Sequence, residues 1–211
     1  MELKIRTAAL TEMFGRVVAA TLALTASVAA QGDVVGWGSS RVSSAWQRES
    51  FVEVEAAGAH TLARRADGAV FAWGYDGYGQ CAVPAAPLGT SYVQIAAGWE
   101  HSLALRNDGR VSAWGANGMG QCNVPALPAG VTYLRVAAGF DHSIAIRSDR
   151  ALVSWGANYV NQSPQWSLPP GNSTYLDVAG GIHHTLALRS DGMIETWGSN
   201  VSGQRNVPAL P

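Results

Sequence analysis

The chain has 211 residues, of which 47% are hydrophobic and 14% are charged, so its composition is that of a globular protein and not of a disordered one. Fourteen basic residues stand against fifteen acidic ones. A nucleic-acid-binding surface needs clustered Lys and Arg, so we expect no nucleic-acid partner.

The first thirty residues have the composition of a secretory signal peptide. Lys4, Arg6 and Arg16 flank an apolar run from Val17 to Ala30 that ends in small residues. The run is shorter than the about 20 apolar residues that span a bilayer. We expect cleavage after Ala30 and a secreted, periplasmic or cell-surface bacterial protein without a membrane span. Met13 heads a shorter but complete signal of its own.

After this segment, one unit of sequence occurs four times. Its clearest copy, residues 92 to 133, reads YVQIAAGWEHSLALRNDGRVSAWGANGMGQCNVPALPAGVTY. The four copies cover about 52–92, 93–133, 134–175 and 176–211, and residues 31–51 hold a partial copy, with its Trp37-Gly38 pair, and a connector. A period in this range is typical of propellers and solenoids.

Two residue types mark the period, and we expect both to be structural. Successive members of each set are 41, 41 and 42 residues apart: Trp73, Trp114, Trp155 and Trp197, and His60, His101, His142 and His184. The tryptophans are predicted to anchor the core between neighbouring units. The histidines are predicted to make hydrogen bonds at a repeated position, because four ligands spread over four units rarely converge on one metal ion.

Within the unit, short apolar runs predict strands and the residues between them predict turns. Strands are expected at 92–97, 101–106 and 110–114, with a weaker fourth strand at 121–124. Asn107-Asp108-Gly109 is typical of a hairpin turn. A four-stranded meander cannot bury both of its faces alone, so the units should stack face to face in an all-β propeller.

Some copies depart from this pattern. Arg64 occupies the position of Leu105, and Trp166 falls where Pro125 would be. Arg150 stands where Gly109 marks the turn, so that turn must change type or carry strain. Asn161 replaces a glycine at a position where Asn best tolerates a positive φ angle.

The pattern AAG-x-x-HSLAL-x-x-DG-x-V-x-AWG-x-N-x-x-GQ-x-x-VP resembles the regulator-of-chromosome-condensation repeat family in its bacterial form. It is similar in its repeats to secreted propellers that inhibit β-lactamases. The resemblance implies a β-propeller, typically of seven four-stranded blades. Because only four full repeats and one partial blade are present, we expect an open or incomplete propeller. Open blade edges favour self-association.

In such a meander, the loops after the first and third strands emerge at the same rim. Aromatic residues interspersed with acids there are typical of a protein-binding surface. The candidate partner-binding residues are Tyr75, Asp76, Tyr78, Trp99, Glu100, Asn117, Met119, Phe140, Asp141, Asn158, Tyr159, Ile182 and His183.

No motif in the sequence indicates catalysis, a cofactor or a metal site. Cys81 and Cys122 occupy equivalent positions of adjacent repeats, which predicts two free, mostly buried thiols. Three sequons begin at Asn161, Asn172 and Asn200. The leading hypothesis is an exported, non-enzymatic protein that binds an unknown protein partner through the rim. The alternatives are a structural surface repeat or propeller fragment without a ligand, and a glycan-binding or glycan-acting protein.

Overall fold

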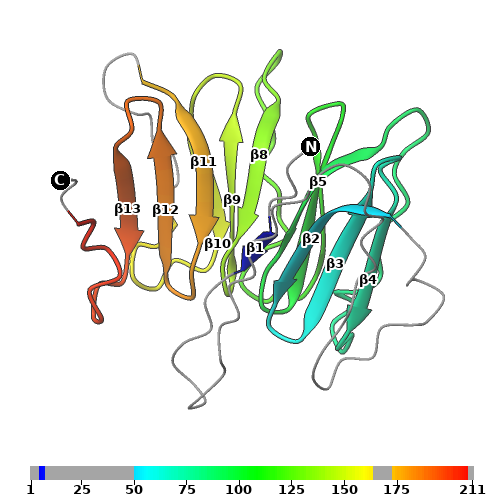
Figure 1. Cartoon of the computed structure of the whole chain (residues 1–211), viewed down its shortest axis with the longest axis horizontal. Helices are drawn as coiled ribbons and strands as arrows, with labels where there is room; N and C mark the ends of the chain where they lie inside the picture. Colours follow the sequence, from blue (N-terminus) through cyan, green and yellow to red (C-terminus); the bar gives the residue numbers. More distant parts are fainter. Residues whose placement is uncertain (1–4, 8–49, 164–172, 209–211) are drawn as a thin grey trace, which may run out of the picture.

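The computed structural model describes residues 5–7, 50–163 and 173–208 (Figure 1). Most of the predicted signal peptide and of the partial repeat lies outside the described residues, as do Trp166 and Asn172. The strands are β1 (Ile5–Thr7), β2 (Phe51–Ala57), β3 (His60–Arg65), β4 (Val70–Gly74), β5 (Tyr92–Ala97), β6 (His101–Arg106), β7 (Val111–Gly115), β8 (Tyr133–Ala138), β9 (His142–Arg147), β10 (Leu152–Gly156), β11 (Tyr175–Gly180), β12 (His184–Arg189) and β13 (Ile194–Gly198).

Each repeat forms one antiparallel sheet, here called a blade. Blade 1 consists of β2, β3 and β4, blade 2 of β5, β6 and β7, blade 3 of β8, β9 and β10, and blade 4 of β11, β12 and β13. The middle strand pairs with both neighbours, so that His101 faces Gly115 across β6 and β7. The strand β1 adds to blade 1 in a parallel pairing with β2.

The predicted fourth strand at 121–124 is wrong. The segment after β7 forms turns, because its backbone N–H and carbonyl groups make hydrogen bonds to the loop and to blade 3 instead of to β7. The N–H of Cys122 donates to the side chain of Asn117, and the N–H of Asn123 donates to the carbonyl of Gly120. The carbonyl of Gln121 accepts from side chains of blade 3. Among the described residues, each blade therefore has three strands of its own repeat, and the segment after β7 joins blade 2 to blade 3.

The core consists of the contacts between blades, as the predicted face-to-face stacking of the units requires. Leu103 and Leu105 of β6 pack against Tyr133, Val136 and Trp155 of blade 3. The other two junctions repeat this arrangement with Leu62 of blade 1 and with the isoleucines of β9. Both faces of an internal blade are buried against the neighbouring blades. Stacked blades are therefore stable, whereas a single blade would not be.

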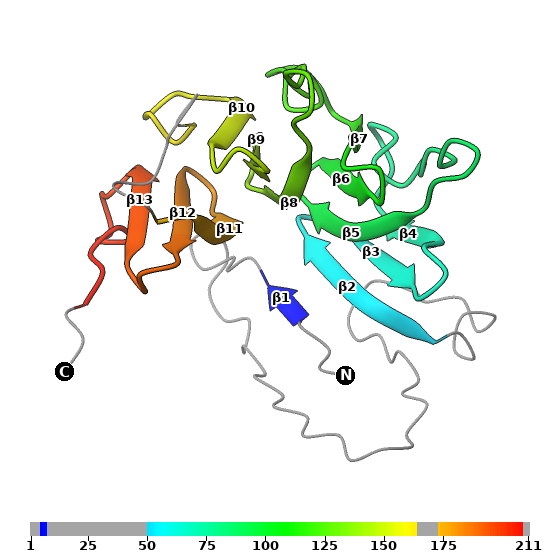
Figure 2. The ribbon, with the colours of Figure 1, turned by 90° about the horizontal axis from the view of Figure 1, so that it is seen from above.

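The four blades form an open arc. The strands β2, β5, β8 and β11 lie along its inner side, and each of these strands contacts the next (Figure 2). In the part of the chain that the structure describes, blade 4 does not pack against blade 1, so the ring is not closed. The predicted incomplete propeller agrees with this arrangement.

The irregular positions follow simple backbone and charge rules. Arg150 adopts φ 74°, equal to that of Gly109, so blade 3 keeps the turn type and accepts the strain of a left-handed arginine. Asn161 also takes a positive φ, of 58°, as expected. Arg64 is compensated by Glu53, whose carboxylate lies 2.7 Å from the arginine Nε and also accepts the N–H of Ile95.

Candidate partner-binding rim

The loops after the first and third strands of each blade do lie on the same rim, because they are hydrogen-bonded to each other. In blade 2 the N–H of Ala116 donates to the carbonyl of Glu100 at 2.8 Å. The same bond joins Ala157 to Asp141 in blade 3 and Ser199 to His183 in blade 4. Residues predicted separately from two loops of the sequence are therefore neighbours at the same edge.

The first loops form an inner row of aromatic side chains across blades 2 to 4. The rings of Trp99 and Phe140 are stacked, with centroids 4.7 Å apart and planes 22° apart, and Phe140 also lies 6.2 Å from the ring of His183. The backbone fixes the row, since the N–H of Trp99 donates to the carbonyl of Phe140, and that of Phe140 to Gly181. A shallow apolar cleft borders the row and is completed by Ile182. The rings are thus held before any partner arrives.

The third loops add an outer group of exposed side chains. Tyr75, Tyr78, Met119 and Tyr159 each expose about half of their surface, between 49% and 59%. The hydroxyl of Tyr159 lies 2.6 Å from the sulfur of Met119, which bridges blades 2 and 3. The ring of Tyr75 packs edge-on against that of Tyr78. Large apolar surface gathered at one edge is typical of a protein-binding site.

Two exposed apolar residues of the same rim were missed by the sequence prediction. Val160 exposes 43% of its surface and Val201 exposes 90%. Val160 occupies the position of Met119 and Val201 that of Tyr159. Comparison of these two positions with those of Met119 and Tyr159 in the neighbouring repeats would have identified both residues from the sequence.

Three of the predicted rim residues stabilise the conformation of their own loops through side-chain hydrogen bonds. The side-chain oxygen of Asp76 accepts the N–H of Cys81 at 2.7 Å. Asn117 does the same for Cys122, and Asn158 for Ser163, each at 2.9 Å. These side chains shape the third loop, so the surface chemistry of the rim rests mainly on the aromatic residues, Met119 and the acids Glu100 and Asp141.

Below the rim, a network of hydrogen bonds joins each blade to the next, and we call it the junction network. His101 Nε2 lies 3.0 Å from the hydroxyl of Ser143 in blade 3. That hydroxyl donates to the carbonyl of Gln121 at 2.7 Å, and the indole N–H of Trp155 donates to the same carbonyl at 2.8 Å. The network therefore ties two blades through one backbone oxygen.

The same arrangement occurs at the other two junctions. His60, Ser102, the Gln80 carbonyl and Trp114 join blades 1 and 2. His142, Thr185 and the Gln162 carbonyl join blades 3 and 4. At these three positions the histidine ring makes a buried hydrogen bond to a hydroxyl of the next blade, as a structural role would require. His184 belongs to the last described blade and has no such hydroxyl partner among the described residues.

The network determines the protonation of its histidines. Because the serine proton goes to the Gln121 carbonyl, His101 Nε2 must carry a proton and donate it. Its Nδ1 is then unprotonated, and it is buried without a partner, as are those of His60 and His142. Burial lowers the pKa of His101 to about 3 and those of His60 and His142 to about 4. These rings are neutral at physiological pH and are unsuited to acid–base chemistry there.

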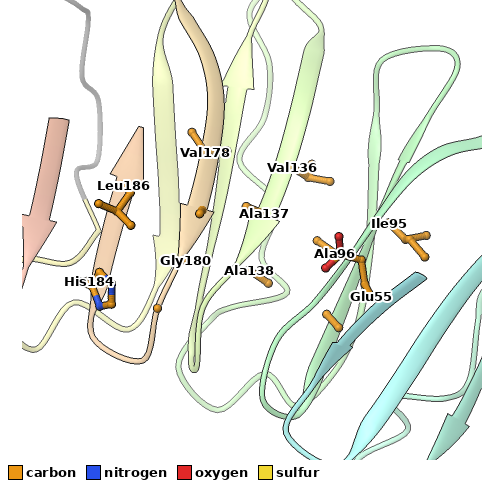
Figure 3. A pocket seen from close by; sticks show the side chains of 13 residues that line it. Glu55, Ile95, Ala96, Val136, Ala137, Ala138, Val178, Gly180, His184 and Leu186 are labelled. Atoms are coloured by element: carbon orange, nitrogen blue, oxygen red, sulfur yellow. The ribbon is translucent and has the colours of Figure 1, made fainter. Parts of the chain in front are cut away.

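The remaining polar groups form no catalytic constellation. In the ranges 50–163 and 173–208, no group of three His, Cys, Asp or Glu side chains converges on a metal position. Cys81 and Cys122 are free, as predicted, but half-buried. A hollow of about 260 Å³ on the inner side of the arc is lined mostly by small or aliphatic residues, together with Glu55 and His184 (Figure 3). No helix among the described residues has the length and hydropathy to cross a membrane.

Stacked three-stranded blades with a shared junction network define a protein of the β-propeller type. The family model of the Regulator of chromosome condensation (RCC1) repeat matches residues 51–80, 92–121, 134–162 and 176–204. The chain belongs to this repeat family. No curated protein matches it in sequence.

Several solved structures are similar to this fold. Prp20p from Saccharomyces cerevisiae is 26% identical, with a TM-score of 0.59 over 72% of this chain and 46% of its own. Human WBSCR16 is 24% identical, with a TM-score of 0.61 over 75% and 50%. The ectodomain of the Physcomitrella patens receptor kinase CR4 is 19% identical, with a TM-score of 0.61 over 78% and 45%. The chain spans about half the length of these structures.

Proposed function

We propose that the protein is an exported, non-enzymatic binding protein that presents the rim of its blades to a protein partner. The observation that carries the proposal is the contrast between a repeated junction network and a rim where the side chains differ from blade to blade. Rigid scaffolds that vary their loops commonly use the loops for binding.

The chemistry of the rim supports a protein partner. Trp99 and Phe140 form a preordered aromatic pair, and aromatic residues are enriched among the residues that dominate binding energy. Glu100 and Asp141 are half-buried beside them, and burial raises the pKa of Asp141. A partner that places apolar side chains on the rings and a basic side chain near the acids would match this surface. Yeast Prp20p, the 26% identical relative, has been studied for its binding to Gsp1p and histones.

The test is an affinity pull-down from the native exported fraction with matched variants. We expect the combined substitution Tyr78→Ala, Met119→Ala and Tyr159→Ala to lower partner affinity at least about tenfold, because truncated hot-spot residues cost about 2 kcal/mol or more. All three side chains are about half exposed, so the fold should survive. Leu88→Ala is the control, since Leu88 is fully exposed in the join that leads to the opposite rim.

A partner that binds the triple variant and the wild type equally would refute the rim as the binding site. Equal loss with Leu88→Ala would show that the effect is not specific to the rim. Export is tested separately, because the protein recovered from its native source should begin at Gln31. An intact N-terminus on the recovered protein would exclude cleavage after Ala30.

A further inference from the structure

The contacts between successive blades are not equally bonded. Among the described residues, the contact between blades 2 and 3, called here the second junction, has a bridge between its inner strands. Nε2 of Gln94 in β5 donates to the carbonyl of Val136 in β8 at 3.0 Å, and Oε1 of Gln94 accepts the N–H of Val136 at 3.1 Å. One side-chain amide therefore joins the two inner strands through both groups of a single residue.

The contact between blades 3 and 4, called here the third junction, has no such bridge in the described part of the chain. Arg135 occupies the position of Gln94, and its Nη1 donates to the carbonyl of Leu134 in its own strand at 3.0 Å. In the next inner strand, the N–H of Val178 donates to the side chain of Asp177, again in the same strand, at 3.1 Å. These side chains therefore make their bonds within one blade instead of across the junction.

The indole of the repeated tryptophan shows the same difference. The N–H of Trp155 donates to the Gln121 carbonyl across the second junction at 2.8 Å. At the third junction the equivalent carbonyl, that of Gln162, accepts the hydroxyl of Thr185 but no indole of the described blades. Trp197, which occupies the position of Trp155, is only partly buried.

The tyrosine that begins the inner strand also changes its partner. The hydroxyl of Tyr133 donates at 2.7 Å to the carbonyl of Pro125, in the segment that leads from blade 2 to blade 3. The hydroxyl of Tyr175 donates at 2.7 Å to Oε2 of Glu195, in β13 of its own blade. Three kinds of hydrogen bond at the second junction thus have no counterpart at the third between residues that the structure describes.

The bonds that remain at the third junction lie near the rim. The N–H of Phe140 donates to the carbonyl of Gly181 at 3.2 Å, and His142 Nε2 lies 2.9 Å from the Thr185 hydroxyl. Phe140 and Gly181 belong to first loops, and His142 and Thr185 are at the strand ends next to them. Tyr175, by contrast, begins β11 at the end away from the rim. Hydrogen bonds therefore fasten the third junction at one end.

We propose that the third junction is a hinge, about which blade 4 moves as a rigid unit relative to blades 1 to 3. The pivot is the rim end, and the far end of β11 moves away from β8. The hollow of about 260 Å³ on the inner side lies between these strands, with Val136 and Val178 on its two sides, so the motion changes its width (Figure 3). It also turns His183 relative to Phe140, so the conformation of the rim depends on the hinge.

Methyl relaxation-dispersion NMR of the full-length protein measures this motion, because hinge motions occur in microseconds to milliseconds. Val178 and Ile144 report on the third junction, and Val136 and Leu103 on the second. We expect exchange with one common rate constant at the first pair and none at the second. No dispersion at the third junction, or equal dispersion at both, would overturn the hinge. No partner is needed, so the result is independent of the proposed function.

Hydrogen exchange distinguishes a hinge from the unfolding of blade 4. The motion breaks no bond of the ladder between β11, β12 and β13. The ladder amides of β12 should therefore be protected to within about tenfold of those of β9. Exchange in β12 that is faster than this would show that blade 4 unfolds, and would overturn the proposal.

Matched variants test the cause of the difference. Gln94→Arg gives the second junction the residue of the third and should produce dispersion at Val136; its absence there would overturn the argument. Thr185→Val removes the hydroxyl of the third junction and should raise the population of the open state roughly tenfold. Ser143→Ala is the equivalent change at the second junction and should leave it closed, because the Gln94 bridge and the Trp155 indole remain. Equal effects of these two variants would contradict the hinge.

Discussion

Lowering the pH from about 7.5 to about 5 should destabilise the protein through the three histidines of the junction network. Burial lowers the pKa of His60 and His142 to about 4 and that of His101 to about 3. A histidine in the unfolded chain has a pKa of about 6.5. Because the folded pKa lies below the unfolded one, the unfolded state takes up protons first as the pH falls. Stability is complete above pH ~6.5 and is lost progressively toward pH ~4.

The magnitude follows from the size of this window. A pH of about 5 lies about 1.5 units below the pKa of a histidine in the unfolded chain, whereas the folded ring stays neutral. Protonation of the unfolded chain therefore lowers the free energy of unfolding by about 2 kcal/mol for each histidine. The three rings together give about 6 kcal/mol, comparable with the whole stability of a typical domain. Asp141 acts in the opposite sense, because burial raises its pKa and its protonation favours the folded state. Asp108 and Asp191 have lowered pKa values and act only below about pH 4.

Urea unfolding followed by tryptophan fluorescence at several pH values measures the effect. Between about pH 5 and pH 6 the unfolding free energy should change by about 3 to 4 kcal/mol per pH unit, which corresponds to nearly three protons. With His142→Gln, the number of protons taken up on unfolding, which this slope measures, should fall by about one. His184→Gln is the matched control, since His184 has the same repeat position without the hydroxyl partner, and should remove less. Asp141→Asn corrects for the opposing carboxyl. A wild-type slope of less than one proton would refute buried neutral histidines.

Three further predictions concern single positions. Gly98→Ala should lower the free energy of unfolding in urea by about 3 kcal/mol, since the new Cβ would lie 2.1 Å from the His101 ring. At Gly118 a new Cβ would have no atom within 4 Å, so Gly118→Ala should change the free energy of unfolding by less than about 0.5 kcal/mol. Similar losses in both variants would contradict the packing argument. Arg64→Leu restores the repeat's usual leucine but should destabilise by about 1–2 kcal/mol, because it leaves the Glu53 carboxylate unpaired, and adding Glu53→Gln should recover the loss; a stabilised single variant would refute this pairing. Burial raises the pKa of Cys122 to about 11. Its reaction with a disulfide reagent at pH ~8 should therefore be roughly tenfold slower than that of an unhindered cysteine, because the smaller thiolate fraction is only partly offset by the higher nucleophilicity of that thiolate. An ordinary rate would exclude this pKa.

The sequence was sufficient for the architecture because its signals are periodic and redundant. The regular spacing of the histidines and tryptophans placed the three strands of every blade, and the antiparallel order of the strands placed Glu100 beside Ala116 on one rim. The departure at Asn161 could also be interpreted locally, since φ angles depend on single residues. These inferences need only backbone rules and side-chain alternation.

The predictions that needed contacts between blades were less successful. The segment at 121–124 has strand-like composition, but the acceptor that it offers is used by Ser143 and Trp155, one repeat further along the chain. Asp76 and Asn117 look like free rim residues in the sequence, although both cap their own loops. In each case the decisive partner is a backbone group, and a sequence pattern does not show which backbone groups remain unpaired.

The same contacts explain why the rim can vary while the blades remain alike. At the tip of each third loop, the side-chain oxygen of a glutamine accepts a backbone N–H, which belongs to Tyr78 in blade 1, Met119 in blade 2 and Val160 in blade 3. The loop uses only the main chain of that residue, so the side chain is free to change without loss of the hydrogen bond. Gly98 is different, since its lack of a side chain makes room for the His101 ring. Substitutions at the loop tips should therefore alter binding with little effect on stability, whereas those at the junction network should do the reverse.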